Sequence, residues 1–177
     1  MPTRVFKNQH PKVAATAYLD PFALVIGDVV VEEWASLWPM VVARGDVNRI
    51  VIGPRTNIQD GSILHVAHQR PAARGGALVI GEYVTVGHQV TLHACTIEHH
   101  CLIGIGSIVL DGAVIQPYTF LAAGSLVPPA KVIEGGHLWR GQPAEKVRPL
   151  TSEEMEYLTY SANHYVQLAQ HYQPLCP

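Results

Sequence analysis

Charged residues are scarce in this chain of 177 residues: they make up 15% of it, and the formal net charge is −2. Because such a chain presents no basic field to a phosphate backbone, nucleic acid is not an expected partner. No apolar run approaches the length of a membrane span, and the start Met1–Arg4 lacks the apolar core of a signal peptide. We therefore expect a cytoplasmic protein with no membrane partner.

Cysteine is also sparse. Cys95, Cys101 and Cys176 are odd in number and do not have the spacing of a metal site. We expect reduced thiols, and we expect Cys95 and Cys101 to be buried because they lie at inward positions of the repeat described next. The length suits one domain with a substantial core.

A short repeat dominates the rest of the sequence. Apolar residues recur mostly at intervals of six, and a small or β-branched residue follows four positions later in nearly every unit. The apolar positions are Leu19, Val25, Val31, Leu37, Ala43, Ile52, Ile58, Leu64, Ile80, Val86, Leu92, Ile97, Ile103, Val109, Ile115, Leu121 and Val127. A fixed short period is typical of a solenoid, whose repeats bury their apolar faces by stacking. Six residues per unit suit one side of a triangular parallel β-helix.

Two interruptions and a closing segment complete the layout. The unit that begins at Ala43 holds nine residues, and the unit that begins at Leu64 holds sixteen. The second excess is polar and contains Pro and Gly, so we expect a corner loop at about 66–79, and such loops often hold functional residues. The β-helix domain is then 1–150, followed by a C-terminal α-helix at 151–173.

The helix is predicted from its start and its spacing. Thr151 and Glu154 fit a capping box, and apolar residues then recur at helical intervals. We expect this helix to pack along the solenoid or against a neighbouring subunit.

Three histidines occupy related positions in the repeat. His65 and His93 are each the second residue of a unit on the same side of consecutive coils, so they lie about 4.8 Å apart. Arg44 has the same position one coil below, and His88 stands above Asp60 on another side. His88 is too far away to join the other two histidines within its own chain, but a threefold trimer can supply it from a neighbour. The sequence predicts three metal sites, each shared by two chains.

Three imidazoles favour a particular chemistry. They leave one position of a tetrahedral ion open, which is the layout of a catalytic zinc site. Water bound at that position has its pKa lowered to about 7, which makes it a nucleophile at neutral pH. We expect Zn²⁺, with Fe²⁺ or Co²⁺ as alternatives, because imidazole also suits those ions.

Several motifs surround these histidines. They are Arg44–Asp46, Asn57–Ser62, His65, Val86–His88, Leu92–His93 and Gly141–Ala144. Together they resemble the γ-class carbonic anhydrases and their close relatives among the hexapeptide-repeat proteins. The resemblance implies an all-β solenoid wound as a left-handed parallel β-helix, and a homotrimer. It also implies a lyase activity, the reversible hydration of CO₂ to bicarbonate by a metal-bound hydroxide.

Specific roles follow from the same resemblance. His65, His88 and His93 would be the metal ligands. Gln59 resembles the residue that orients the metal-bound hydroxide, and Tyr165 resembles a helix tyrosine that lines the same pocket. Such residues position the nucleophile and tune the metal.

The resemblance also implies contacts between subunits. Arg44 and Asp60 resemble an ion pair that joins two subunits, and Asp46 would stand beside it. Asn163, near Tyr165 in sequence, is a further candidate for the catalytic site.

The sequence departs from the best-known active member of the family, which carries glutamates that move protons from the metal to solvent. Here the residue after Asp46 is Val47, which is not acidic, and residues 66–79 contain no Asp or Glu. Hydration of CO₂ needs a proton exit, so we expect weak activity. His68 can substitute, because a histidine has an unperturbed pKa of about 6.5.

Other functions remain open for this fold. Many hexapeptide-repeat proteins transfer acyl groups from coenzyme A with a single histidine base, although such enzymes need no stacked columns of histidines. Two further candidate functions are thioester hydrolysis at the same metal site and a non-catalytic role as a metal-clamped trimer. The remaining histidines lack matched partners in the repeat and are expected to be structural or on the surface: His10, His99, His100, His137, His164 and His171.

Overall fold

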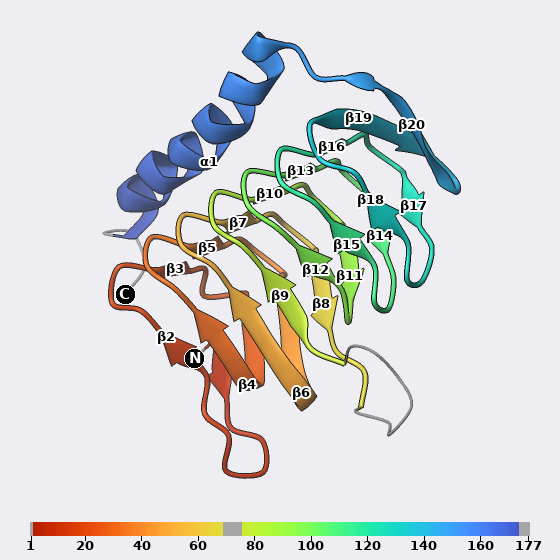
Figure 1. Ribbon diagram of the computed structural model, residues 1–177. Helices are drawn as coiled ribbons and strands as arrows, with labels where there is room; N and C mark the ends of the chain where they lie inside the picture. Colours follow the sequence, from red (N-terminus) through yellow and green to blue (C-terminus); the bar gives the residue numbers. More distant parts are fainter. Residues whose placement is uncertain (1, 69–75, 174–177) are drawn as a thin grey trace.

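The structure is a computed structural model that describes residues 2–68 and 76–173. The chain winds as a parallel β-solenoid of about seven turns, with one helix along its side (Figure 1). The prediction of a left-handed β-helix of hexapeptide repeats with a C-terminal helix is therefore confirmed. Within the described residues, no helix combines the length and apolar character that a membrane span requires.

One flat face of the solenoid, which we call the helix face, forms a separate sheet. Its strands are β3 (Tyr18–Leu19), β5 (Ser36–Leu37), β7 (Asn57–Ile58), β10 (Thr85–Val86), β13 (Leu102–Ile103), β16 (Phe120–Leu121) and β19 (His137–Gly141). All are parallel neighbours in this order. At the C-terminal end, β20 (Ala144–Pro149) pairs antiparallel with β19.

The other two faces are joined by β4 (Leu24–Val31) and β6 (Val42–Ile52), two long strands that continue around a corner. The face on which His65 and His93 lie, the histidine face, contains the first halves of β4 and β6 together with β1 (Thr3–Arg4), β8 (Ile63–His65), β11 (Thr91–His93), β14 (Ile108–Val109) and β17 (Leu126–Val127). The third face contains their second halves together with β2 (Lys12–Val13), β9 (Leu78–Ile80), β12 (Thr96–Ile97), β15 (Val114–Ile115) and β18 (Val132–Ile133).

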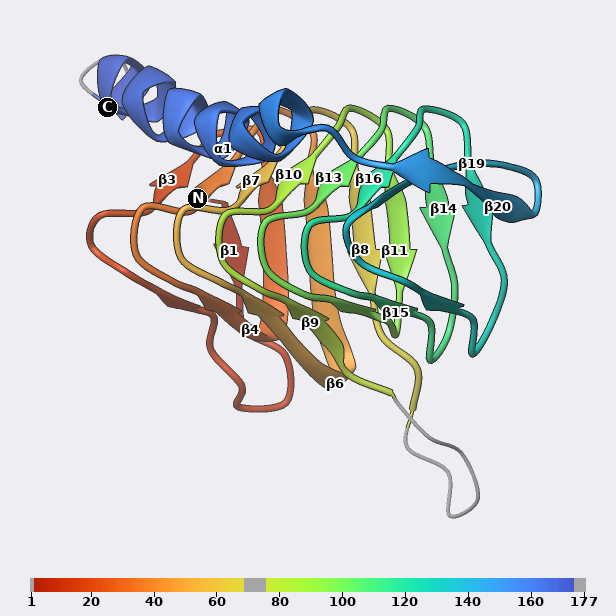
Figure 2. The ribbon, with the colours of Figure 1, turned by 45° about the horizontal axis from the view of Figure 1, so that its top comes forward.

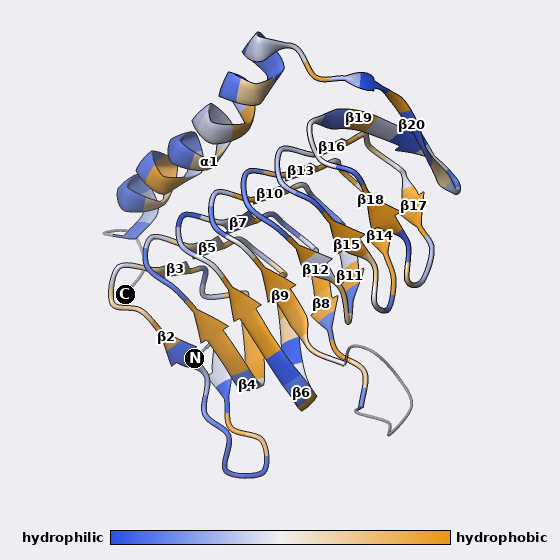
Figure 3. Cartoon of the chain, in the orientation of Figure 1, coloured by the Kyte–Doolittle hydropathy of each residue, from blue (hydrophilic) through white to orange (hydrophobic). Residues whose placement is uncertain are grey.

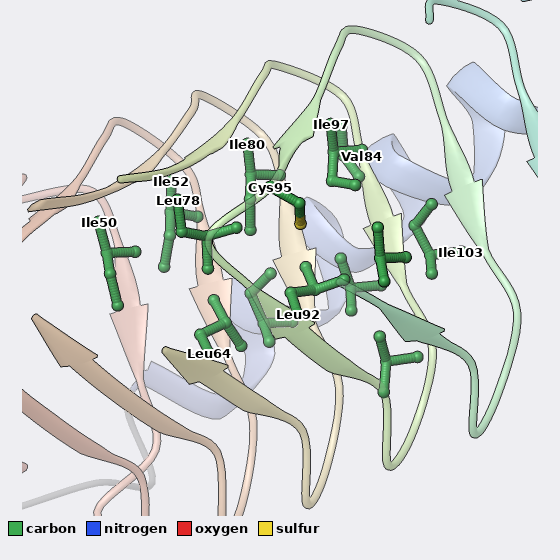
Figure 4. Packing of buried hydrophobic residues seen from close by; sticks show 14 of the residues in the cluster. Ile50, Ile52, Leu64, Leu78, Ile80, Val84, Leu92, Cys95, Ile97 and Ile103 are labelled. Atoms are coloured by element: carbon green, nitrogen blue, oxygen red, sulfur yellow. The ribbon is translucent and has the colours of Figure 1, made fainter. Parts of the chain in front are cut away.

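The core is a stack of aliphatic side chains inside the triangle, as Figure 4 shows. The predicted register is confirmed, because Ile58 pairs with Val86 and Leu64 with Leu92, all of them fully buried. The coils do not all have the same length, since Leu92 and Ile97 are five residues apart and Ala94 makes the corner between them with a φ of 46°. Figure 3 shows the apolar character of the strands that supply this stack.

Cys95 and Cys101 are buried free thiols in this core, as expected. Burial raises the pKa of each thiol to about 12, so neither supplies a thiolate at neutral pH. Cys176 lies outside the described residues.

The predicted corner loop lies between β8 and β9 in the sequence, and its residues 69–75 lie outside the described ranges. The N–H of Ala67 donates to the carbonyl of Gly76 at 3.0 Å. This bond joins the two ends of the insertion at the surface of the solenoid.

The helix α1 spans Ser152–Tyr172 and begins with the predicted capping box, in which Thr151 and Glu154 exchange two hydrogen bonds. Figures 1 and 2 place it along the helix face, where it contacts β5, β7 and β10. Tyr165 packs edge-on against Trp38, with ring centroids 5.5 Å apart. The helix therefore packs on the solenoid of its own chain, one of the two positions that the sequence left open.

Candidate metal centre

Two of the three candidate histidines stack on the histidine face. His65 and His93 are register partners, and Arg44 is the partner of His65 one coil below, as predicted. The Nδ1 atom of His65 lies 3.2 Å from Nε2 of His93, and the ring centroids are 5.2 Å apart. The repeat therefore brings two ring nitrogens together at one corner of the solenoid.

The other nitrogen of each ring faces a carboxylate. Nε2 of His65 lies 3.1 Å from Oδ1 of Asp46, and Nδ1 of His93 lies 2.9 Å from Oδ1 of Asp111. An ionised carboxylate only accepts hydrogen bonds, so these two ring nitrogens carry the hydrogens. When both rings are neutral, Nδ1 of His65 and Nε2 of His93 are then left facing each other with their lone pairs.

This arrangement fits a bound cation. Two imidazole nitrogens that bind one tetrahedral zinc ion with bonds of about 2.05 Å lie roughly 3.3 Å apart. The 3.2 Å between His65 and His93 matches that spacing. Two lone pairs repel at this distance unless a proton or a metal ion lies between them, so the pair is suited to hold a metal.

His88 lies elsewhere in the chain, in the turn before β11, where its Nδ1 is 2.9 Å from Oδ2 of Asp60. The corner at Gln89, where φ is 57°, and the strand β11 lie between His88 and His93, so the two side chains lie at opposite ends of this side of the coil. No group of three His, Cys, Asp or Glu side chains in the described part of the chain converges to hold a metal. His88 of the same chain therefore cannot complete the site of His65 and His93.

Glycine allows the coils to approach closely beside these residues. A Cβ atom on Gly45 would lie 2.5 Å from the carbonyl oxygen of Asp28, and one on Gly87 would lie 2.9 Å from the main-chain nitrogen of Ile105. Both distances are too short for any other residue without a shift of the backbone. The glycines that precede Asp46 and His88 thus keep these side chains in the register of the stack.

Asp46 contacts both Arg44 and His65. Its partial burial alone would raise the pKa of the carboxyl, but the hydrogen bonds from Arg44 and His65 outweigh this effect, and the pKa lies below its usual value. Asp46 is therefore ionised at neutral pH. Arg44 pairs with Asp46 within the chain, and its predicted ion pair with Asp60 of another subunit stays a prediction.

Gln59 is buried and belongs to a chain of polar contacts that reaches the helix. Its Nε2 donates to Oδ1 of Asn57 at 3.1 Å, and Nδ2 of Asn57 donates to Oγ1 of Thr85 at 3.0 Å. Thr85 in turn contacts the hydroxyl of Ser161 on α1 at 3.1 Å. The amide of Gln59 is thereby held in one orientation.

Gln59 and Tyr165 line one hollow between α1 and the helix face, with a volume of about 630 Å³. Partial burial raises the pKa of the Tyr165 hydroxyl, and the negative charge of Asp60 adds to this effect. Tyr165 therefore stays protonated at neutral pH and can donate a hydrogen bond. Two predicted catalytic residues thus line the same hollow, beside Gly87 and close in sequence to His88.

The remaining candidates lie apart from this hollow. Oδ1 of Asn163 accepts a hydrogen bond of 3.4 Å from Arg55, whose guanidinium lies over the ring of Tyr83, so Asn163 helps to hold the helix on the solenoid. His68 is exposed at the start of the corner insertion, three residues after His65. Sequence reasoning missed Asp111, although it is only one residue beyond the position that stacks above His93.

The sequence is similar to several known proteins, whereas no protein-family model matches it. It is 47% identical to protein YrdA of Escherichia coli over 170 residues, which cover 96% of this chain and 92% of that protein. It is 44% identical over 170 residues to the carbonic anhydrase of Geobacillus kaustophilus, covering 96% of this chain and 90% of that protein. Identity to the mitochondrial gamma carbonic anhydrase 2 of Arabidopsis thaliana is 42% over 163 residues, 92% of this chain and 59% of that protein.

Solved structures share the fold at comparable identity. A Bacillus cereus protein provisionally named an acetyltransferase superposes with a TM-score of 0.91 at 41% identity, covering 98% of this chain and 97% of that chain. A hexapeptide transferase family protein of Anaplasma phagocytophilum gives a TM-score of 0.90 at 41% identity, covering 96% and 97%. From the sequence relatives and the shared β-helix, this chain belongs to the γ-carbonic anhydrase family of hexapeptide-repeat proteins.

Proposed function

We propose that this protein is a metal-dependent carbonic anhydrase, which converts CO₂ and water reversibly into bicarbonate and a proton at sites shared between the subunits of a cytoplasmic homotrimer. The observation that carries the proposal is the pair of facing ring nitrogens of His65 and His93, 3.2 Å apart. The carbonic anhydrases among the sequence relatives support the same chemistry.

The proposed ligands are His65 and His93 of one chain and His88 of the neighbouring chain. Zn²⁺ suits three imidazoles with an open fourth position, and Fe²⁺ or Co²⁺ can replace it. When bound, the ion lowers the pKa of a water molecule to about 7 and so makes it a nucleophile at neutral pH. The contact of each histidine with a carboxylate, Asp46, Asp111 or Asp60, fixes which ring nitrogen is left to bind.

The positions of the histidines on the solenoid support the proposed trimer. His88 lies at one edge of the histidine face, and His65 and His93 lie at the other edge. In a threefold arrangement, one edge of each chain meets the opposite edge of the next chain. Ile63 and Ile108 are large aliphatic residues exposed on this face, and an interface would bury them. Arg44 has donors to spare beyond Asp46 and can reach Asp60 of the neighbour.

Gln59 and Tyr165 come to each site together with His88 of their own chain. The Asn57 contact holds the Gln59 amide, whose oxygen can accept a hydrogen from the attacking water and so direct the lone pair of that water at CO₂. The apolar part of the hollow, which includes Ile105 and Leu102, suits an uncharged substrate such as CO₂. The proton released by the reaction has to reach solvent, and His68 is the proposed carrier. Without an acidic residue in 66–79, this step is slow and the activity is weak.

Acyl-group chemistry is the second candidate. The hollow of about 630 Å³ is larger than CO₂ requires, and Phe120 and Leu138 in its wall suit an acyl chain. The names of the two solved structures point to transferases. Acyl transfer from coenzyme A or hydrolysis of a thioester would use this space, whereas a metal-clamped trimer without activity would use neither the hollow nor the open metal position.

Metal content and oligomeric mass, measured on anaerobically purified protein, test the proposal first. We expect about one ion per chain and the mass of a trimer. Stopped-flow CO₂ hydration with zinc- and iron-loaded protein then tests the activity, with acetyl-coenzyme A turnover as the comparison. A stable monomer that keeps stoichiometric metal would contradict the shared site. A metal-loaded trimer that hydrates no CO₂ would contradict the carbonic anhydrase.

A further inference from the structure

His93 makes a contact that the family resemblance does not account for. Its Nδ1 lies 2.9 Å from Oδ1 of Asp111, in the turn that follows β14 one coil above. The carbonyl of Asp111 accepts a hydrogen bond of 2.8 Å from the N–H of Ala130, so the next coil holds this turn in place. The carboxylate is thus presented to His93 by the fold itself.

We infer that Asp111 is a positioning residue for His93: its carboxylate accepts the Nδ1 hydrogen, which leaves Nε2 without a hydrogen and directed at His65. The inference rests on the proposed metal site and adds to it a residue that orients one ligand. A neutral imidazole can carry its hydrogen on either nitrogen, and the hydrogen bond made by one nitrogen decides the state of the other. With the hydrogen on Nε2, His93 would point a donor at the place where the metal binds.

The surroundings of Asp111 favour this role over a general structural one. Among the described residues, His93 is the only basic side chain within 4.0 Å of its carboxylate. Asp46, by contrast, serves both Arg44 and His65, so its removal would disturb two contacts. About half of the Asp111 side chain is exposed, 49%, so its replacement leaves no cavity in the core. Replacing Asp111 therefore removes one contact to one ligand.

The first test uses metal-free protein. With ¹⁵N-labelled protein at a pH where imidazoles are neutral, the chemical shifts of ring nitrogens report which one carries the hydrogen, and His93→Gln identifies the His93 signals. We expect Nδ1 protonated and Nε2 unprotonated in the wild type, and loss of this preference in Asp111→Ala. Asp111→Asn keeps an acceptor oxygen without the charge and should give an intermediate result. Glu145→Ala, at an exposed position on β20, removes the same charge and should change nothing.

The second test measures the affinity for Zn²⁺ and Co²⁺ by competition with a chromophoric chelator. Loss of a carboxylate that orients a ligand histidine weakens metal binding about 10–100-fold, and we expect this for Asp111→Ala. Asp111→Asn should lose less, and the visible spectrum of bound Co²⁺ should change in Asp111→Ala but not in Glu145→Ala. In the His93→Ala background, Asp111→Ala should have no further effect, because the two residues act as one unit.

The outcomes separate the two proposals. Wild-type metal affinity and an unchanged His93 hydrogen position in Asp111→Ala would overturn the role of Asp111 and leave the metal site standing. A wild-type protein that binds no metal would overturn the proposed function, and the measurement on metal-free protein would then still decide whether Asp111 sets the state of His93. Should Asp111→Ala fail to fold, judged by circular dichroism, Asp111→Asn serves both tests.

Discussion

His88 and His93 flank the same short strand: His88 lies in the turn before β11, and His93 is the last residue of β11. The corner at Gln89 and the strand β11 lie between them, which assigns them to different edges of the histidine face. In the proposed trimer, each chain contributes His88 to one site and His65 with His93 to another.

Mixed trimers test this sharing directly. His65→Ala and His88→Ala each remove a ligand and should lack stoichiometric metal. When the two variants are unfolded, mixed and refolded together, random assembly places an intact pair of edges at roughly a quarter of the interfaces, so metal and activity should partly return. Metal analysis and CO₂ hydration measure the recovery. A mixture of His65→Ala with His93→Ala is the control, since both lesions lie on the same edge and no interface is restored. Full metal content in His88→Ala alone would contradict the prediction.

Replacement of Gln59 should impair the reaction without loss of metal. Gln59→Ala removes an amide that Asn57 holds in place, and loss of an oriented polar group at a reacting oxygen lowers kcat by a factor on the order of 10². Steady-state CO₂ hydration, together with metal content, checks this. Asn57→Ala should lower kcat less, because Gln59 remains but is no longer held. Wild-type kcat in Gln59→Ala would remove this residue from the mechanism.

His68 should matter only for the transfer of protons. His68→Ala is expected to keep its metal and to lose turnover when buffer is dilute, because proton exit then depends on the side chain. At high buffer concentration the buffer carries the proton, and the rates of variant and wild type should converge. Stopped-flow measurements over a buffer series test this, with His10→Ala as a control for loss of a distant imidazole. Equal turnover at every buffer concentration would exclude His68 as the carrier.

The start of α1 should lose stability in acid. Hydrogen bonds from Arg148, and from the N–H of Thr151, lower the pKa of Glu154 to about 2. Since the pKa of an unfolded Glu is about 4.3, this contribution is fully present above that pH and is lost as the pH falls towards 2. The melting temperature of the wild type should therefore fall more steeply between these values than that of Glu154→Gln. Glu156→Gln, exposed on the same helix, is the control and should follow the wild type.

The stack beneath the histidines should tolerate little loss of volume. Leu92 is fully buried directly before His93, and Leu92→Ala should lower the free energy of unfolding by about 2–5 kcal/mol. Chemical denaturation at one fixed protein concentration measures this, because the stability of an oligomer depends on concentration. Thr96→Ala changes an outward-facing position on the third face, away from the proposed interface, and should cost less than about 0.5 kcal/mol. A similar cost for both variants would contradict the inward assignment of Leu92.

The repeat allowed the register of the solenoid to be predicted, and with it the column of Arg44, His65 and His93. The helix start was equally accessible, because the Thr151–Glu154 capping box is a local signal. These features depend on residues at a fixed spacing, and spacing is what a sequence displays directly.

Other features depend on where a side chain reaches rather than on its position in the repeat. Asp111 is offset by one residue from the column of His93 and contacts it only because the turn after β14 directs the carboxylate down by one coil. Asn163 was a candidate for the catalytic site because it lies near Tyr165 in the sequence, and its amide oxygen contacts Arg55 at a corner of the solenoid. The spacing from Leu92 to Ile97 is five residues, one fewer than in the repeat. The sequence did not reveal this difference because both positions are still apolar.

The hydrogen bond between Ala67 and Gly76 has a consequence for how such proteins can diversify. Because it ties the two ends of the insertion at the wall of the solenoid, segments of different length or composition can be exchanged beyond it without moving His65 or His93. This corner is therefore a position at which a different binding loop can replace the present one while the solenoid keeps its geometry.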